Sequence, residues 1–298
     1  MANKKLSEDE KSVLEQFMIP FFHLEKRFPL FPGKLNKEAE SLLLGISRDE
    51  LIKNRANLTE NSKQAALELL KEDEIIDLLE DIPLDGEETI VALGDSITED
   101  AQGWFEILRQ VLEIGVEDAN FTFVNSGVAY NTTADALRRV DRDVLMHEPD
   151  WVFVALGTFD VQRLSIAQDR TLLPLSETWE NLNTIQEVVG NRCENPILWV
   201  TPTPVIEELL VENPIYEYSI SERDLVEVRE LIAGKTGGIV DPRGLRMGEN
   251  EAEAWNYIGD GLHHSLSGHM NTVREVLRTM AEVGAKNSHE HGPDQHQH

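Results

Sequence analysis

The chain has 298 residues, of which 41% are hydrophobic, enough for one α/β domain with a large core and an additional segment. Its formal net charge is −28, from 27 basic and 55 acidic residues. Such a surface repels phosphate backbones and anionic lipid headgroups, which excludes nucleic acid and membranes as expected partners. Lysine is rare after Lys71, and this acidic composition fits either adaptation to a salty cytoplasm or an ordinary acidic bacterial-type protein.

The first part of the chain, residues 1–86, is predicted to be an N-terminal helical domain. It contains no convincing strand pattern, and apolar residues recur at helical spacing, as in Ala66, Leu69 and Leu70. Residues 82–86, with a proline and a glycine, are typical of a link to the next unit. The sequence assigns no function to this domain.

Targeting signals are not expected. The apolar run at residues 17–22 is short and contains Pro20, which is too little for a signal-peptide core, and no stretch is long enough to span a membrane. Cys193 is the single cysteine, so an intrachain disulfide is impossible, and its expected role is that of a small buried residue. We therefore expect a cytoplasmic protein.

From residue 87 onward, predicted strands alternate with predicted helices, over a second domain assigned to residues 87–286. This alternation predicts an α/β fold with a parallel sheet covered on both faces. The predicted strands are residues 89–93, 121–124, 151–156, 197–201 and 238–240. Helical spacing of apolar residues lies between them at 137–144, 182–189 and 225–232, and again at 273–280. Ser221 and Asp224 occupy the positions of a capping box before the 225–232 pattern.

A serine follows the first predicted strand, in the run Gly94-Asp95-Ser96-Ile97-Thr98. A helical pattern comes next, with four apolar residues on one face: Trp104, Leu108, Val111 and Leu112. Ser96 is therefore expected where a strand turns into a helix. Backbone N–H groups of a first helical turn have no intrahelical partners and favour negative charge, so they would stabilise an alkoxide or oxyanion there. Taken alone, Gly-Asp-Ser is also ordinary turn chemistry.

An aspartate and a histidine near the C-terminus, Asp260 and His263, can activate such a serine. An imidazole accepts a hydroxyl proton near neutral pH, and a carboxylate on its other ring nitrogen fixes the tautomer. The structural alternative is a common Asp-Gly turn with a surface histidine. His264 is adjacent, so spacing alone leaves open which of the two imidazoles faces Ser96.

These blocks resemble the GDSL, or SGNH, hydrolase family over about residues 88–284. Ser96, Asp260 and His263 match the family's nucleophile, orienting carboxylate and base, and Gly127 in Val-Asn-Ser-Gly matches its second block. The resemblance implies a three-layer α/β/α flavodoxin-like fold with a five-stranded parallel sheet. It also implies an oxyanion hole with the backbone N–H groups of Ser96 and Gly127, and no cofactor or metal.

The third block departs from the family, because Gly157-Thr158-Phe159-Asp160 has Phe159 in place of an asparagine that donates to the oxyanion. A phenyl ring cannot donate, so we expect slow turnover unless Asn125 or Asn131, which flank Gly127, fills the gap. The alternative is that Phe159 narrows the acyl pocket.

Other segments could border the site. Pro202, after the fourth strand, is a candidate wall of the substrate pocket or an ordinary strand exit. The apolar stretch 205–219 is either a lid or a single helix. Residues 287–298 are predicted to be a disordered, histidine-rich tail that binds metal weakly, without the spacing of a catalytic metal site.

The function predicted from these observations is hydrolysis of small or medium carboxylic esters by a Ser96-His263-Asp260 triad through an acyl-serine intermediate. A small-molecule acyl ester is the expected partner, and the oligomeric state is left open. The alternatives are an acyl-thioesterase or carbohydrate deacetylase of the same family. A weakly active, hydrolase-like binding protein is a further alternative, which the substitution at Phe159 favours.

Overall fold

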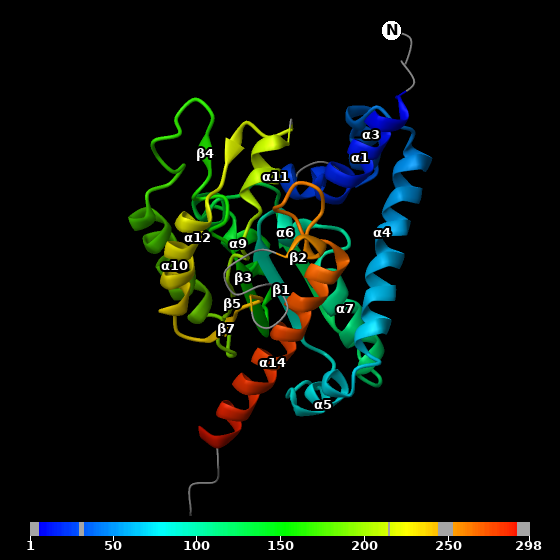
Figure 1. The fold of residues 1–298 in the computed structure, drawn as a ribbon. Helices are drawn as coiled ribbons and strands as arrows, with labels where there is room; N and C mark the ends of the chain where they lie inside the picture. Colours follow the sequence, from blue (N-terminus) through cyan, green and yellow to red (C-terminus); the bar gives the residue numbers. More distant parts are fainter. Residues whose placement is uncertain (1–5, 30–32, 214, 244–252, 291–298) are drawn as a thin grey trace, which may run out of the picture.

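A computed structural model describes residues 6–29, 33–213, 215–243 and 253–290 (Figure 1). A five-stranded sheet lies at its centre, with strand order β2-β1-β3-β5-β7 and every neighbouring pair parallel. Its strands are β1 (Thr89–Gly94), β2 (Thr122–Gly127), β3 (Trp151–Ala155), β5 (Leu198–Val200) and β7 (Gly238–Val240). Each predicted strand overlaps one of these, so the predicted α/β class and the five-stranded parallel sheet are confirmed.

Helices cover both faces of the sheet, because its central strands are apolar on both sides. In β1, Ile90 and Ala92 point into one hydrophobic cluster, while Val91 and Leu93 point into the other. The first cluster includes residues of α7 (Trp104–Gly115) and α14 (Leu266–Glu290). The second includes residues of α8 (Thr133–Leu137), α9 (Val140–Asp143), α10 (Leu175–Gly190) and α12 (Glu222–Ala233).

Most predicted helical patterns are helices, with differences at their ends. The 137–144 pattern is divided between α8 and α9, which are followed by a 3-10 turn, η2 (Leu145–His147). Helix α12 begins after Ser221, whose side chain accepts the N–H of Asp224 at 3.3 Å, one half of the predicted capping box. Helix α14 continues to Glu290, so residues 287–290 of the predicted disordered tail are helical, and residues 291–298 lie outside the described residues.

Before β1, the described residues form helices and no strand, as predicted. These elements are α1 (Glu8–Phe17), η1 (Ile19–Phe21), α2 (Leu24–Arg27), α3 (Gly33–Leu44), α4 (Arg48–Leu69) and α5 (Asp73–Asp81). Helix α4 runs beside α7, and α5 lies against the lower half of α14 (Figure 1). Ala66, Leu69 and Ile75 belong to the same hydrophobic cluster as the sheet. The second half of this segment therefore shares its core with the α/β unit, and the domain boundary at residue 86 stays a prediction.

A two-stranded antiparallel ribbon lies beyond the carboxyl edge of the sheet. It pairs β4 (Arg163–Leu164) with β6 (Tyr218–Ser219). The stretch 205–219, expected to be either a lid or one helix, instead contains the short helix α11 (Glu207–Glu212) followed by β6. A last 3-10 turn, η3 (Ala254–Asn256), precedes the loop that carries Asp260 and His263.

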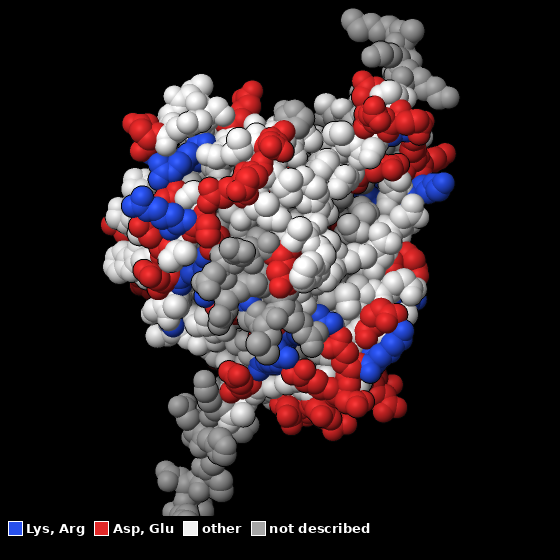
Figure 2. Space-filling view, in the orientation of Figure 1, with Lys and Arg blue, Asp and Glu red and all other residues white. Residues whose placement is uncertain are grey.

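On the face shown in Figure 2, acidic side chains gather most densely at the lower edge, over α5, and uncharged side chains occupy much of the rest. Within the described ranges, no helix is both long enough and apolar enough to cross a membrane.

Candidate active site

The candidate site lies where the strands end, because the carboxyl ends of parallel strands meet at one edge of a sheet. Ser96 follows β1 and is the first residue of α6 (Ser96–Glu99). The expected strand-to-helix turn is present, but α6 is a single turn that ends before α7 begins. The N–H groups expected to favour negative charge at Ser96 therefore belong to the single turn of α6, while Trp104, Leu108, Val111 and Leu112 lie in α7. Asp95 caps α6 by accepting the N–H of Ile97 at 3.0 Å.

Three of the predicted residues form one hydrogen-bonded chain. His263 Nε2 lies 2.8 Å from Ser96 Oγ, and His263 Nδ1 lies 2.6 Å from Asp260 Oδ2. The other oxygen of Asp260 accepts the backbone N–H groups of Leu262 and His263 at 3.0 and 2.9 Å. These bonds fix the carboxylate within its own turn, so the imidazole has one orientation, with Nε2 directed at the serine.

The ionisation of this chain suits proton transfer. Burial alone would lower the pKa of His263, but the charge and hydrogen bond of Asp260 outweigh it and raise that pKa above the usual value. Burial would likewise raise the pKa of Asp260, yet His263 and the backbone donors lower it. Asp260 is thus an anion across the neutral range, facing an imidazole that can accept a proton.

The predicted role of His263 as the base implies that activity depends on pH, because only a neutral imidazole can accept a proton. As pH falls through the raised pKa of His263, the ring becomes charged, so we expect kcat/KM to fall on the acid side, with a midpoint above the usual imidazole value. In Asp260→Asn the anion is lost, so the residual activity should have its acid limb at lower pH. A kcat/KM profile of both proteins measures this. An acid limb that does not move would contradict the assigned pair.

Tyr216 also contacts this chain, and sequence reasoning assigned it no role. Its hydroxyl donates to Asp260 Oδ2 at 2.7 Å and lies 3.4 Å from His263 Nδ1. The only signal in the sequence was its place in the apolar stretch 205–219. Such a signal does not reveal that the segment doubles back onto the 260–263 turn.

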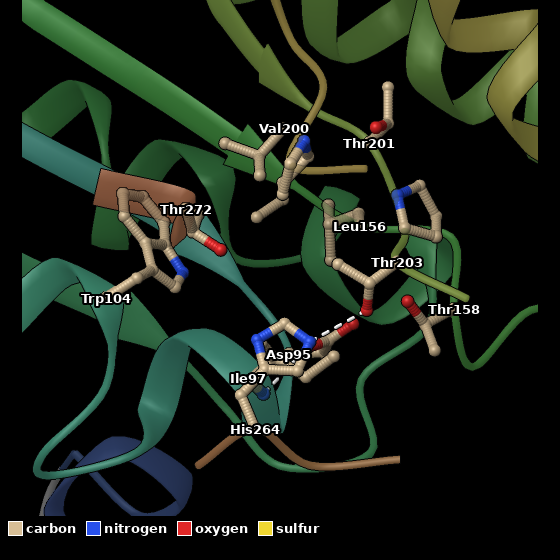
Figure 3. A pocket seen from close by; sticks show the side chains of 13 residues that line it. Asp95, Ile97, Trp104, Leu156, Thr158, Val200, Thr201, Thr203, His264 and Thr272 are labelled. Carbon is tan, nitrogen blue, oxygen red and sulfur yellow. Dashed lines mark hydrogen bonds between the residues drawn. The ribbon is translucent and has the colours of Figure 1, made fainter. Parts of the chain in front are cut away.

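His264 faces away from Ser96. Its Nε2 pairs with the hydroxyl of Thr203 at 2.8 Å, and burial together with the nearby imidazoles lowers its pKa well below the usual value. It lines a cavity of about 30 Å³, together with Asp95 and Thr203 (Figure 3). This volume is suited to a water molecule, and Pro202 is also among the residues that border the cavity. Burial raises the pKa of Asp95 to about 7.

The predicted second-block residues are engaged by protein groups. The N–H of Gly127 donates to Asn125 Oδ1 at 3.0 Å, and a Cβ at Gly127 would lie 2.3 Å from the backbone nitrogen of Glu99. The amide nitrogen of Asn125 donates to the carbonyl of Thr98 at 2.8 Å. Gly127 therefore allows close packing of β2 against α6. The structure does not present it or Asn125 as a free donor.

The left-handed residue Tyr130 follows this block, with φ of 64°. Its backbone N–H has no hydrogen-bond partner in the part of the chain that the structure describes, and the same holds for the N–H of Ser96. Asn131 is held by Arg139, which donates to its Oδ1 at 2.8 Å.

Phe159, from the third block, is fully buried and packs edge-on against Tyr130, with ring centroids 5.4 Å apart. Its neighbour Asp160 accepts the N–H of Thr133 and the hydroxyl of Thr178, each at 2.8 Å. The third block thus ties α8 and α10 to the sheet edge, and Phe159 packs beside the loop that carries Tyr130.

Other reactive groups do not join the site. Cys193 is buried, and burial raises the pKa of its thiol to about 11, so it fits the predicted role of a small core residue. Among the described residues, no group of three or more His, Cys, Asp or Glu side chains is arranged to hold a metal ion.

A comparison with known families decides the family of this chain. The model of the GDSL-like Lipase/Acylhydrolase family matches residues 92–270, more than half of the sequence. The chain belongs to this family. The resemblance expected from the sequence is therefore confirmed, and the match includes Ser96, Asp260 and His263.

Two curated relatives differ in how much of their sequence aligns with this chain. It is 33% identical to the uncharacterized lipoprotein YqeF of Bacillus subtilis (strain 168) over 132 residues, 41% of this chain and 51% of that protein. The chain therefore spans about half the length of this relative. It is 25% identical to an acetylxylan esterase of Geobacillus stearothermophilus over 224 residues, 66% of this chain and 94% of that protein.

Solved structures show the same fold. The lipase/acylhydrolase from Enterococcus faecalis has a TM-score of 0.52 at 23% identity and covers 65% of this chain and 96% of its own. A variant of an acetyl xylan esterase from Geobacillus stearothermophilus has a TM-score of 0.53 at 21% identity and covers 65% and 95%. At these identities the likeness establishes the fold alone.

The N-terminal segment of this GDSL-family chain precedes the family match and covers the candidate site. The ring of Phe21 lies against the imidazole of His263, with centroids 4.3 Å apart. Ser96 and Asp260 are 0% exposed and His263 is 1% exposed, so the site is closed.

Hydrogen bonds from several N-terminal residues hold this cover in place. The N–H of Ala101 donates to the carbonyl of Pro20 at 3.1 Å, and His23 Nδ1 lies 3.1 Å from Glu99 Oε1. Lys26 donates to Asn125 Oδ1 at 2.9 Å, and Arg27 donates to the carbonyl of Ala129 at 3.0 Å. The segment from Pro20 to Arg27 therefore bonds to the loops that follow both β1 and β2. We call residues 20–27 the N-terminal cover.

Proposed function

We propose that this protein is a serine esterase that hydrolyses carboxylic esters of short acyl groups through an acyl-serine intermediate. The observation that supports this most strongly is the unbroken chain from Ser96 Oγ to His263 Nε2 at 2.8 Å and from His263 Nδ1 to Asp260 Oδ2 at 2.6 Å. Turnover of p-nitrophenyl acetate and of acetylated xylo-oligosaccharides tests the proposal, and a folded protein inactive on both would contradict it.

Each residue of the chain has one role in the proposed reaction. Ser96 Oγ attacks the acyl carbonyl while His263 Nε2 takes its proton, and Asp260 stabilises the imidazolium that forms. The tetrahedral intermediate expels the alcohol, which receives the proton from His263. Water then attacks the acyl-serine with His263 again as base, which releases the acid and restores Ser96.

The oxyanion of the intermediate needs hydrogen-bond donors. We propose the backbone N–H groups of Ser96 and Tyr130, since neither has a partner among the described residues. Tyr130 replaces Gly127 in this role, because the Gly127 N–H already donates to Asn125. Asn125 is no longer proposed as a substrate ligand, because its amide nitrogen donates to the carbonyl of Thr98 and its oxygen accepts the N–H of Gly127. Asn131 is held by Arg139 through its oxygen alone, so its amide nitrogen stays a proposed donor.

A short acyl group fits the surroundings of Ser96. The buried ring of Phe21 packs against His263, and the buried ring of Phe159 packs against Tyr130. The acetylxylan esterase among the relatives acts on an acetyl ester by its name, which is consistent with this size. The identity of the alcohol is not part of the proposal.

We predict that Phe21→Ala broadens the range of acyl lengths. Removing the ring over His263 opens space for a longer chain, so kcat/KM for p-nitrophenyl octanoate relative to the acetate should rise at least several-fold. A panel of acetate, butyrate and octanoate esters measures this ratio. Phe28→Ala, at an exposed phenylalanine beyond the cover, is the matched control and should leave the ratio unchanged. An unchanged ratio in folded Phe21→Ala would show that the N-terminal cover does not limit acyl length.

Thioester cleavage is the second proposal, since the same triad attacks any activated acyl group. The absence of an amide at Phe159 favours a third possibility, a weakly active binding protein. Turnover of acetyl thioesters at a rate above that of matched oxygen esters would favour the thioesterase. Turnover of neither would favour the binding protein.

We further propose a cytoplasmic location and retain residues 1–86 as an N-terminal helical domain whose function includes covering the site. The composition and the single cysteine support the location, while the lipoprotein relative is a reason to test it by fractionation. The oligomeric state is not part of the proposal.

A further inference from the structure

The hydroxyl of Tyr218 is a buried polar group without a partner. Its oxygen is inaccessible to solvent and makes no hydrogen bond to any described residue. A buried hydroxyl without a partner is costly, and such groups in folded proteins usually serve a function or meet a ligand. Tyr216 and Tyr257, by contrast, both donate to protein oxygens.

Tyr218 lies among the residues that surround the candidate site. Its ring centroid is 6.4 Å from that of Tyr130, 6.2 Å from that of Phe159 and 5.1 Å from that of Tyr216. Tyr130 follows β2, Phe159 follows β3, and Tyr216 donates to Asp260. The ring that carries this hydroxyl therefore belongs to an aromatic cluster at the candidate site. The cluster contacts the loop that holds the Tyr130 N–H, the third block, and, through Tyr216, the triad.

The phenol is a donor at every working pH. Burial raises the pKa of Tyr218, and the neighbouring Tyr130, Asp260 and Asp95 raise it further, so the hydroxyl keeps its proton. The protein offers it no acceptor among the described residues. A substrate carbonyl would supply an acceptor, and the oxyanion that it becomes on Ser96 would be a stronger one.

A fixed backbone position supports this side chain. Residue 218 pairs with Leu164 in the β4-β6 ribbon, and Arg163 in the same ribbon donates to both oxygens of Asp224 in α12, at 2.7 and 3.0 Å. A bidentate pair of this kind fixes orientation as well as distance. The ribbon is thus anchored to the α/β unit, and the Tyr218 ring is held before substrate binds, as an effective oxyanion donor requires.

We propose that the Tyr218 hydroxyl is a catalytic residue that donates a hydrogen bond to the oxyanion on Ser96, in place of the side-chain donor that Phe159 cannot supply. This inference rests on the proposed esterase function. It assigns to a residue of β6, outside all the sequence blocks, a stabilisation that neither Phe159 nor the engaged amide of Asn125 provides.

Tyr218→Phe tests this role, because it removes only the oxygen. Loss of one oxyanion donor costs on the order of a hundred- to a thousandfold in kcat, so we expect a fall of about that size on p-nitrophenyl acetate, with KM changing by only a few-fold. The melting temperature should stay the same or rise, since the lost hydroxyl has no partner in the protein. The acid limb of the pH profile should not move, because Tyr218 makes no hydrogen bond to His263.

Tyr257→Phe is the matched control, since it removes another largely buried tyrosine hydroxyl, one that donates to the carbonyl of Pro204 at 2.6 Å. It should keep the parental kcat and lose some thermal stability. Folded Tyr218→Phe with parental kcat would overturn the inference. A shifted acid limb in Tyr218→Phe would also overturn it, because the residue would then act through His263.

A boronic acid that forms a tetrahedral adduct on Ser96 gives a second measurement. Tyr218→Phe should weaken methylboronic acid inhibition at least tenfold while leaving inhibition by the acid product nearly unchanged. Equal losses for both inhibitors would contradict a transition-state role.

Wild-type turnover separates the two proposals. An inactive wild type refutes the esterase, whereas an active wild type with an equally active Tyr218→Phe refutes only the inference.

Discussion

Ser96→Ala should abolish ester hydrolysis, with a loss of more than roughly a thousandfold in kcat, because no other described hydroxyl is bonded to His263 Nε2. The protein should remain folded, since the only recorded bond of the Ser96 hydroxyl is to His263 and a hydrogen bond contributes about 0.5–1.5 kcal/mol. Initial rates on p-nitrophenyl acetate, with a thermal melt of the same sample, measure both quantities.

Ser126→Ala is the matched control for this substitution. Ser126 is another buried serine at the carboxyl edge of the sheet, but its hydroxyl donates to the carbonyl of Asp143 at 2.6 Å and not to the imidazole. Its loss should affect stability more than turnover. Folded Ser96→Ala that turns over ester at the parental rate would remove the serine from the mechanism.

Asp260→Asn should have the next largest effect. An asparagine fills the same space, but it has no charge and so cannot stabilise an imidazolium. Its amide nitrogen can also donate to Nδ1 of His263, which favours the tautomer whose proton is on Nε2. In that tautomer Nε2 cannot accept the proton of Ser96. For a serine protease the corresponding loss is about 10⁴-fold in kcat, and we expect a fall of at least about a thousandfold here. Steady-state kcat at a pH above the acid limb measures the effect without contribution from titration of the base.

Substituting the neighbouring histidine, His264, shows whether a loss of activity is specific to His263. His264 bonds to Thr203 and not to Ser96, so folded His264→Ala should keep activity within a few-fold of the parent, while His263→Ala should be inactive. An inactive, folded His264→Ala beside an active His263→Ala would show that the base had been assigned to the wrong imidazole.

The sheet could be predicted from the sequence because its physical cause is local. Residues 89–93 and 151–156 are apolar runs buried on both faces, and helical spacing between such runs leaves few arrangements other than a parallel sheet. Ser96 and the 260–263 turn could be selected because their chemistry resides in short blocks. Chain topology, which the sequence does not display, then brings the two blocks within a hydrogen bond of each other.

Other features of the site depend on contacts between distant segments, and no local pattern reveals these. One difference is instead local, because the N–H of Gly127, expected to serve an oxyanion, donates to Asn125 only two residues earlier. Phe21 is one apolar residue in a short run, and only the packing of η1 against the 263 loop gives it a role. The partnerless state of Tyr218 likewise appears only when every neighbour is in place.

Covalent labelling of Ser96 tests the central claim most directly. The intact protein, treated with a fluorophosphonate probe and digested for peptide mass spectrometry, should carry one adduct, on Ser96. Ser96→Ala should not be labelled, and His263→Ala should be labelled much more slowly, while Ser126→Ala should be labelled like the parent. An unlabelled wild-type protein, or an adduct on a residue other than Ser96, would contradict the account.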